Sequence, residues 1–198
     1  MDLVIENVGR RSGEWGKAGD PTDVGTHSLN GYERNALFRN LGDGRFEDVA
    51  HLVGANRIED GRAVATADFD HDGHLDLVIN SLDRPAVLLM GRGGGGHWLE
   101  LELRGAGANP DAVGATVIAH VGERRLARQR IVGTGFLSAS SPVLHFGLGA
   151  ATQVDGLEIR WPGGERQWLP GVRADQRITV VQGSADRRTS MITRRRAG

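Results

Sequence analysis

The sequence predicts an all-β protein, and three observations favour this class. Glycine accounts for 30 of the 198 residues, roughly twice its usual share, which is typical of many short strands joined by tight turns. Long runs rich in Ala, Leu, Glu and Lys, which favour helices, are missing. Residues 98–103 place Leu99, Leu101 and Leu103 alternately with glutamates, as in a half-buried strand.

The first half of the chain contains a predicted hairpin. Residues 36–40 and 45–49 flank residues 41–44, whose Asp43-Gly44 step supplies the positive φ that a tight hairpin turn requires. Further strands are expected around residues 63–67, 75–80 and 86–90. We therefore expect residues 36–90 to form a meander, and residues 1–35, rich in Gly, Asp, Asn and Thr, to be largely irregular.

A glycine-rich stretch at residues 91–96 is flexible and cannot pack, so it predicts a domain junction. Beyond it, strands are expected at 98–103, 115–121, 126–131, 144–146, 157–161, 166–169 and 178–181. Gly, Pro or Asp separates these segments, which favours a compact β-sandwich or barrel-like domain. The sequence thus predicts domains at 1–92 and 97–183, followed by a disordered basic tail at 184–198.

Composition excludes several kinds of protein. The 24 Lys and Arg residues nearly balance the 25 Asp and Glu residues, so no overall charge favours nucleic acid. The absence of cysteine excludes disulfides, thiolate metal sites and cysteine nucleophiles. No apolar run approaches the roughly 18 residues that span a bilayer, and no export signal is visible in the chain as written.

The strongest chemical signal lies between two predicted strands. Asp68, Asp70, Asp72 and Asp76 occupy positions one, three, five and nine of a loop with Gly73 at its sharp turn. The backbone carbonyl of His74 would add a fifth oxygen ligand, although its side chain is expected to point outward. A set of hard oxygen donors suits Ca²⁺ better than Mg²⁺, which demands an octahedron and retains its waters.

Electrostatics favours a cation over a simple solvated turn. Four carboxylates about 5 Å apart repel by roughly 0.8 kcal/mol per pair at the dielectric of water, so six pairs cost on the order of 5 kcal/mol. Such a cost is comparable to the whole stability of a small domain. The loop lacks the Glu that an EF-hand has at position twelve, and its flanks are predicted strands rather than helices. We therefore predict a calcium site in a loop between two strands.

Other patterns carry weaker signals. Residues 91–96 satisfy G-x-G-x-x-G, but a predicted strand rather than a helix follows, so a dinucleotide site is not expected. A Ser/His/Asp arrangement around His145 lacks a nucleophile elbow, and we predict no catalytic residues and no cofactor other than calcium. Trp161 and Trp168 flank a turn, where a packed aromatic pair is favoured over a carbohydrate platform.

The acidic loop and several further motifs resemble known families. Residues 68–76 resemble the calcium loop of FG-GAP or VCBS-type β-propeller repeats, and residues 37–46 resemble the hairpin that precedes it. The second half resembles the ASPIC/UnbV domain, which follows a propeller in the cartilage acidic protein-like family. The motifs that carry this second resemblance are residues 109–115, 133–138, 144–149 and 154–164.

The resemblance implies one or two propeller blades with a calcium loop, followed by the ASPIC/UnbV-like domain. Propellers need roughly four to eight blades, so the chain is expected to be a C-terminal fragment or to self-associate through open sheet edges. The implied function is a calcium-binding, non-catalytic interaction or adhesion module that binds a protein or glycan, outside the cell or in the periplasm. Because some family members are encoded beside enediyne genes, the alternative is an enzyme or accessory protein of bacterial secondary metabolism.

Overall fold

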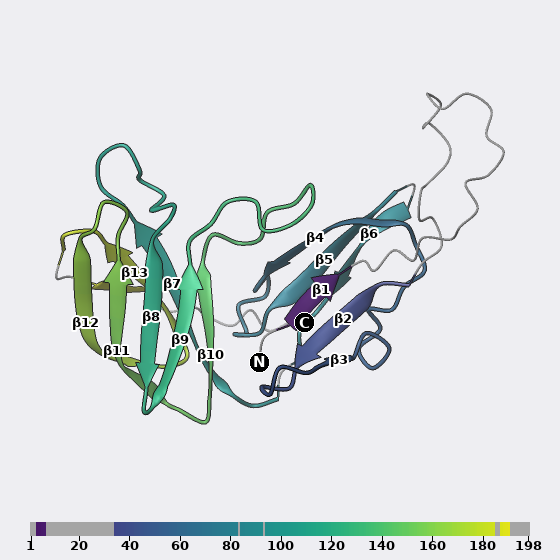
Figure 1. The fold of residues 1–198 in the computed structure, drawn as a ribbon, viewed down its shortest axis with the longest axis horizontal. Coiled ribbons are helices and arrows are strands. Elements are labelled where there is room, and N and C mark those ends of the chain that lie inside the picture. The colour runs from purple at the N-terminus through teal and green to yellow at the C-terminus, as the bar shows by residue number, and fades with distance from the viewer. Residues whose placement is uncertain (1–2, 7–33, 83, 93, 185–186, 191–198) are drawn as a thin grey trace. The chain divides into compact units, whose positions relative to one another are not determined.

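The computed structural model describes residues 3–6, 34–82, 84–92, 94–184 and 187–190, and its regular elements are β-strands (Figure 1). Within these ranges there is no helix, and hence none that is long and apolar enough to cross a membrane. The all-β prediction is confirmed at the level of fold class. Residues 7–33, most of the segment predicted to be irregular, lie outside the described residues.

The chain divides into two compact units. The first comprises Met1–Val64 and Val78–Leu89, and the second comprises Ala65–Leu77 and Met90–Gly198. The division after Leu89 falls beside the predicted glycine junction. The acidic segment, however, groups with the second unit, whereas the sequence prediction placed it with residues 1–92. The domain limits of 1–92 and 97–183 stay predictions.

The predicted hairpin is confirmed as the core of a small sheet. Strands β2 (Ala36–Asn40) and β3 (Phe46–Asp48) pair antiparallel, with Phe38 opposite Asp48, and β1 (Leu3–Glu6) pairs antiparallel with the other edge of β2. The connecting turn uses Gly44 at a φ of 82°, a left-handed conformation that glycine adopts without steric cost. The Asp43-Gly44 signal therefore identified the turn correctly.

The next three strands form a separate sheet in the order β4-β5-β6. Their bounds are Gly61–Ala67, Asp76–Ser81 and Arg84–Leu89. The prediction of one continuous meander over residues 36–90 is therefore wrong. The segment after β3 folds back on itself, with the amide of Ala55 donating to the carbonyl of Ala50, and this local turn separates the two sheets.

The second unit contains two four-stranded sheets, ordered β10-β7-β13-β14 and β12-β11-β8-β9 (Figure 1). Their strands are β7 (His97–Arg104), β8 (Thr116–Val121), β9 (Arg124–Gln129), β10 (Leu144–Gly149), β11 (Gln153–Arg160), β12 (Arg166–Arg173), β13 (Gln176–Val181) and β14 (Arg187–Ser190). Alternate apolar residues of both sheets form one buried cluster. Leu101, Phe146, Leu157 and Ile178, for example, are fully buried in it. Two sheets that share one buried apolar cluster have the layering of a β-sandwich, and the term sandwich refers to this pair below.

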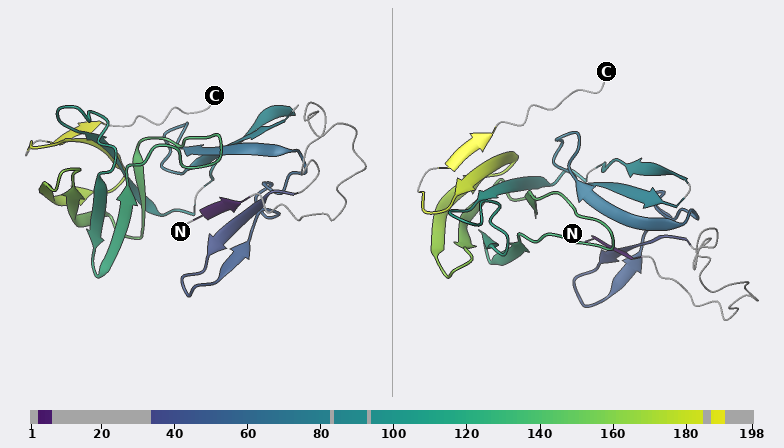
Figure 2. Two further views of the ribbon diagram at one scale, coloured as in Figure 1. Left: turned by 45° about the horizontal axis from the view of Figure 1, so that its top comes forward. Right: turned by 90° about the horizontal axis from the view of Figure 1, so that it is seen from above.

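The C-terminal segment differs from the predicted disordered tail. Arg187–Ser190 form β14, which pairs antiparallel with β13 and is drawn in yellow beside it in Figure 2. Backbone pairing needs no apolar side chains, so a polar, arginine-rich segment can still supply an edge strand to an open ladder. Residues 185–186 and 191–198 lie outside the described residues.

Candidate functional site: the acidic loop and its seat

Three of the four predicted carboxylates converge. Asp68 follows β4 directly, Asp76 begins β5, and Asp70 lies in the loop that joins these strands. One oxygen from each carboxylate lies within 4.8 Å of the other two. Asp68 and Asp76 are buried and Asp70 is half-buried, so this trio, hereafter the carboxylate cluster, is partly withdrawn from water.

Backbone amides orient two members of the carboxylate cluster. The amides of Asp72 and Gly73 donate to the two oxygens of Asp68, at 3.1 and 2.9 Å. The amide of Phe69 donates to Asp76 Oδ2 at 2.8 Å, and the amide of Gly91 donates to Asp76 Oδ1 at 2.7 Å. A carboxylate oxygen has two acceptor positions, so each can accept an amide proton and still face a cation. Gly91 thus belongs to the site rather than to a free linker.

Asp70 differs from Asp68 and Asp76 in its hydrogen bonding. Its Oδ1 is buried and has no hydrogen-bond partner among the described residues. A buried carboxylate oxygen without a donor is costly, whereas coordination of a cation would satisfy it. The donor set of three hard oxygens, one of them lacking any proton donor, therefore fits a divalent cation.

The two other predicted ligands, Asp72 and the His74 carbonyl, are not among the three converging carboxylates. Asp72 lies outside the carboxylate cluster, and its Oδ1 accepts a hydrogen bond from the amide of His74 at 2.9 Å. This bond closes a local turn, which explains why an Asp at this position suits the loop without contributing to the cluster. The His74 carbonyl stays a predicted ligand.

The acidic loop is seated on the second unit's own β-sandwich. Gly73 has a φ of 90°, and a Cβ added there would lie 1.9 Å from Nε1 of Trp98 on β7. His145 on β10 places Nε2 2.9 Å from the Gly73 carbonyl oxygen, and because a carbonyl only accepts, this nitrogen is the donor. Trp98 and His145 stack with their ring centroids 6.4 Å apart. His145 therefore has a structural role in this contact.

A second contact fixes the strand that leads into the loop. The amide of Ser141 donates to the carbonyl of Thr66 at 2.8 Å, and the amide of Thr66 donates to Oγ of Ser140 at 3.2 Å. These serines, with His145 on the Gly73 carbonyl, are therefore engaged in seating the loop. Asp155 accepts a bond from the amide of Gly122 at 2.8 Å, so its carboxylate and the His145 ring bond to different groups.

The two tryptophans near the β11–β12 turn do not pair. Trp161 is buried in the core, and its Nε1 donates to Gln167 at 2.9 Å, whereas Trp168 is 53% exposed. Trp168 lies opposite Glu158 in the sheet, which is an outward position because neighbouring Leu157 and Ile159 face the core. The expected aromatic pair is therefore wrong, and strand parity is the signal that distinguishes the two faces.

Comparison with family models places two families along this chain. A model described as "FG-GAP-like repeat" matches residues 22–79, and a model described as "ASPIC and UnbV" matches residues 105–187. The first match contains the carboxylate cluster, and the second covers most of the sandwich. Both resemblances predicted from the sequence motifs are confirmed.

Curated relatives carry the same name in three species. Cartilage acidic protein 1 of Xenopus tropicalis is 37% identical over 117 residues, which is 54% of this chain and 17% of that protein. The mouse protein is 34% identical over 114 residues, covering 53% of this chain and 17% of the relative, and the human protein is similarly 34% identical. The matched stretch thus spans only about a sixth of these relatives.

Proposed function

Because this chain is an FG-GAP-like repeat followed by an ASPIC and UnbV domain, distantly similar to cartilage acidic protein 1, we propose that it is a calcium-binding, non-catalytic interaction module. The observation that carries the proposal is the carboxylate cluster with its unpartnered, buried Asp70 oxygen. Asp68, Asp70 and Asp76 would hold the ion. Asp72 and the His74 carbonyl are proposed as additional ligands, directly or through water.

The chemistry of the cluster supports Ca²⁺ over Mg²⁺. Mg²⁺ demands a near-ideal octahedron and retains its waters, whereas Ca²⁺ accepts six to eight oxygen ligands in a flexible geometry. The three carboxylate oxygens lie within 4.8 Å of one another. Calcium also tolerates an irregular set of protein and water ligands, as this half-buried loop would provide.

The proposed role of the ion is structural. It would neutralise three converging negative charges and hold Gly73 against Trp98 and His145, so that the loop stays seated on the sandwich. An open loop of this type fills at the calcium concentrations found outside cells, which supports an extracellular or periplasmic location. We also propose that the module binds a protein or glycan ligand and that it self-associates through open sheet edges.

Calcium binding can be tested on the chelator-treated full chain by thermal unfolding and isothermal calorimetry. We expect CaCl₂ to raise the melting temperature far more than equal MgCl₂, because the ion relieves repulsion within the carboxylate cluster. Asp70→Asn should abolish this calcium-dependent increase and the binding heat. Asp72→Asn, whose amide oxygen can keep the turn to His74, should retain part of both.

The matched control is Asp111→Asn, which removes an exposed carboxylate elsewhere in the second unit and should leave calcium stabilisation unchanged. If calcium does not alter the melting of the unsubstituted chain, or stabilises Asp70→Asn equally well, the proposed cation site is wrong.

A further inference from the structure

Trp168 is an exposed aromatic residue held in a fixed position. A Cβ added at Gly156, on the neighbouring strand, would lie 2.1 Å from Cζ2 of Trp168, so the indole rests directly on glycine backbone. His120 meets the ring edge-on, with the centroids 5.1 Å apart and the planes at 72°. The ring is therefore supported from below and at one edge while 53% of the residue stays exposed. A pre-positioned aromatic face lowers the entropic cost of stacking a ligand on it.

Charged groups surround this ring on the outer face of the β12-β11-β8-β9 sheet. Glu158 lies directly opposite Trp168, and its carboxylate is 2.8 Å from Nε of Arg160 and 3.5 Å from a terminal nitrogen of Arg166. The hydrogen bond from Arg160 lowers the pKa of Glu158, so this carboxylate is ionised and already matched by one guanidinium. Arg166 is 70% exposed and shares Glu158 with Arg160, so two guanidinium charges face one carboxylate.

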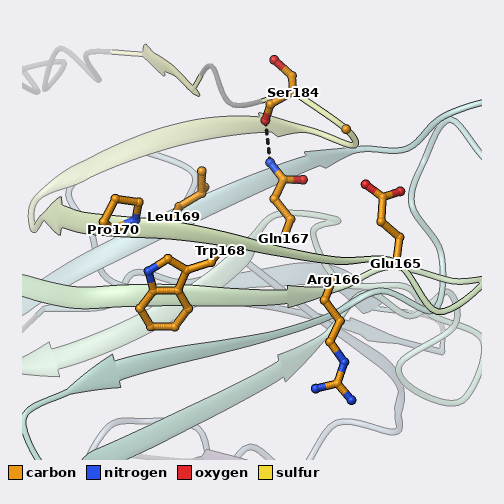
Figure 3. Close-up of a pocket in the computed structure, with 8 residues that line it drawn as sticks. Glu165, Arg166, Gln167, Trp168, Leu169, Pro170 and Ser184 are labelled. Atoms are coloured by element: carbon orange, nitrogen blue, oxygen red, sulfur yellow. Dashed lines mark hydrogen bonds between the residues drawn. The ribbon is translucent and has the colours of Figure 1, made fainter.

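A pocket lies beside the same ring. It has a volume of about 350 Å³, and its lining includes Arg166, Trp168, Pro170 and Gly183. Figure 3 shows Arg166 and Trp168 pointing to one side of β12, whereas Gln167 points to the other side and donates to the Ser184 carbonyl at 2.6 Å. Because Glu165, Gln167 and Ser184 also line it, this space follows the edge strand β12 and adjoins the outer face only beside Trp168 and Arg166.

From this arrangement we propose that the outer face around Trp168 and Arg166 binds an acidic saccharide. The indole of Trp168 would stack on the apolar C–H face of a sugar ring, and the Arg166 guanidinium would pair with a carboxylate or sulfate on that sugar. This proposal names a ligand class for the interaction module proposed above, but it uses the sandwich alone and does not involve the cation site.

A protein strand is the less suitable occupant. Strand β12 is at the edge of its sheet, yet Pro170 lacks the amide proton that an added strand would need, and Gly171 has a φ of 43°. A nucleic acid would need several phosphate contacts, whereas Arg160 beside the ring is already paired with Glu158. Binding of a protein strand or of a nucleic acid would give results in the test below that differ from those expected for a saccharide.

The test uses the full chain and three oligosaccharide probes of equal length. Alginate hexasaccharide carries carboxylates, chondroitin sulfate hexasaccharide carries carboxylates and sulfates, and cellohexaose is neutral. Binding is followed by calorimetry and by saturation-transfer NMR, in CaCl₂ and again in EDTA. We expect at least one acidic probe to bind and to weaken with added salt, with cellohexaose at least about tenfold weaker.

Substitutions identify the surface. Trp168→Ala should weaken the acidic probe about tenfold or more, and Trp168→Phe should recover part of the loss because a smaller aromatic face remains. Arg166→Ala should weaken binding severalfold and reduce its salt dependence. The matched control, Arg173→Ala, removes an exposed arginine at the far end of the same strand and should bind as the unsubstituted chain does. Near-ultraviolet circular dichroism verifies that each variant is folded.

Several outcomes would overturn the proposal. These are no binding of either acidic probe, equal binding of cellohexaose, or unchanged binding by folded Trp168→Ala. Equal or tighter binding of an oligothymidylate, or a change of oligomeric state in Trp168→Ala, would instead indicate nucleic acid or a second copy. Because EDTA removes the cation, saccharide binding that persists in EDTA does not depend on the calcium site. The saccharide proposal and the calcium proposal can therefore be tested and rejected separately.

Discussion

The β-sandwich of the second unit and the small sheets of the first unit are built from similar short strands but differ in how they are covered. In β7, the residues from Trp98 to Glu100 and Leu101 are all buried, and opposing strands close over them. In β3 every residue is exposed, and the part of β4 that belongs to the first unit, Gly61 to Val64, is only half-buried. Alternating strands therefore become a stable domain only when a second sheet covers the apolar face.

The largest expected difference between the two regions is in core packing. Phe146 is fully buried in the sandwich, so Phe146→Ala should cost about 3–5 kcal/mol. Phe46 is 52% exposed, and Phe46→Ala should change the unfolding free energy by no more than about 0.5 kcal/mol. Urea unfolding followed by far-ultraviolet circular dichroism measures both.

Phe136→Ala, at a site 73% exposed within the second unit, controls for the loss of an aromatic residue as such. Equal costs for Phe146→Ala and Phe46→Ala would show that the first unit has a comparable core, and the contrast would have to be abandoned.

A smaller effect is expected on self-association. Leu88 lies in β6, an edge strand of the β4-β5-β6 sheet, and is 51% exposed. Covering the exposed half of such a side chain is worth about 1 kcal/mol, and several such side chains along an open strand favour association. Leu88→Glu should weaken association about tenfold or more, as measured by sedimentation velocity across a concentration series. A monomer at all concentrations, with or without the substitution, would contradict this expectation.

A further effect concerns the contact between loop and sandwich. Gly73→Ala and Gly163→Ala both place a side chain at a φ near 90°, which costs about 1–3 kcal/mol, but only Gly73 faces a ring, that of Trp98. Gly73→Ala should therefore lose about 1–3 kcal/mol more, because Trp98 must move, and should shift the tryptophan fluorescence maximum. If the two variants melt alike with unchanged emission, the loop is not seated against Trp98.

Local signals in the sequence predicted most strands and three members of the acidic site. The Asp43-Gly44 turn and the alternation around Leu101 are properties of neighbouring residues, and so is the spacing of Asp68 and Asp70. These features need no knowledge of distant contacts, which is why sequence reasoning recovered them.

The missed features depend on residues far apart along the chain. The bond from Gly91 to Asp76 and the seat formed by Trp98 and His145 join segments separated by 15 to 72 positions. No local pattern encodes such contacts. The opposite faces of Trp161 and Trp168 could have been found, because Leu157 and Ile159 fix which residues of β11 point inward.

The pairing of β7 with β13 has a mechanical consequence. These strands run parallel, in a register from Leu99 opposite Gln176 to Arg104 opposite Val181. Tension applied between the start of β7 and the end of β13 therefore pulls along the ladder and loads its hydrogen bonds together, whereas antiparallel β14 can peel from β13 one bond at a time. Under a stretching force the terminal hairpin should yield first, and the two central strands should then resist in shear as the tension-bearing link of the domain.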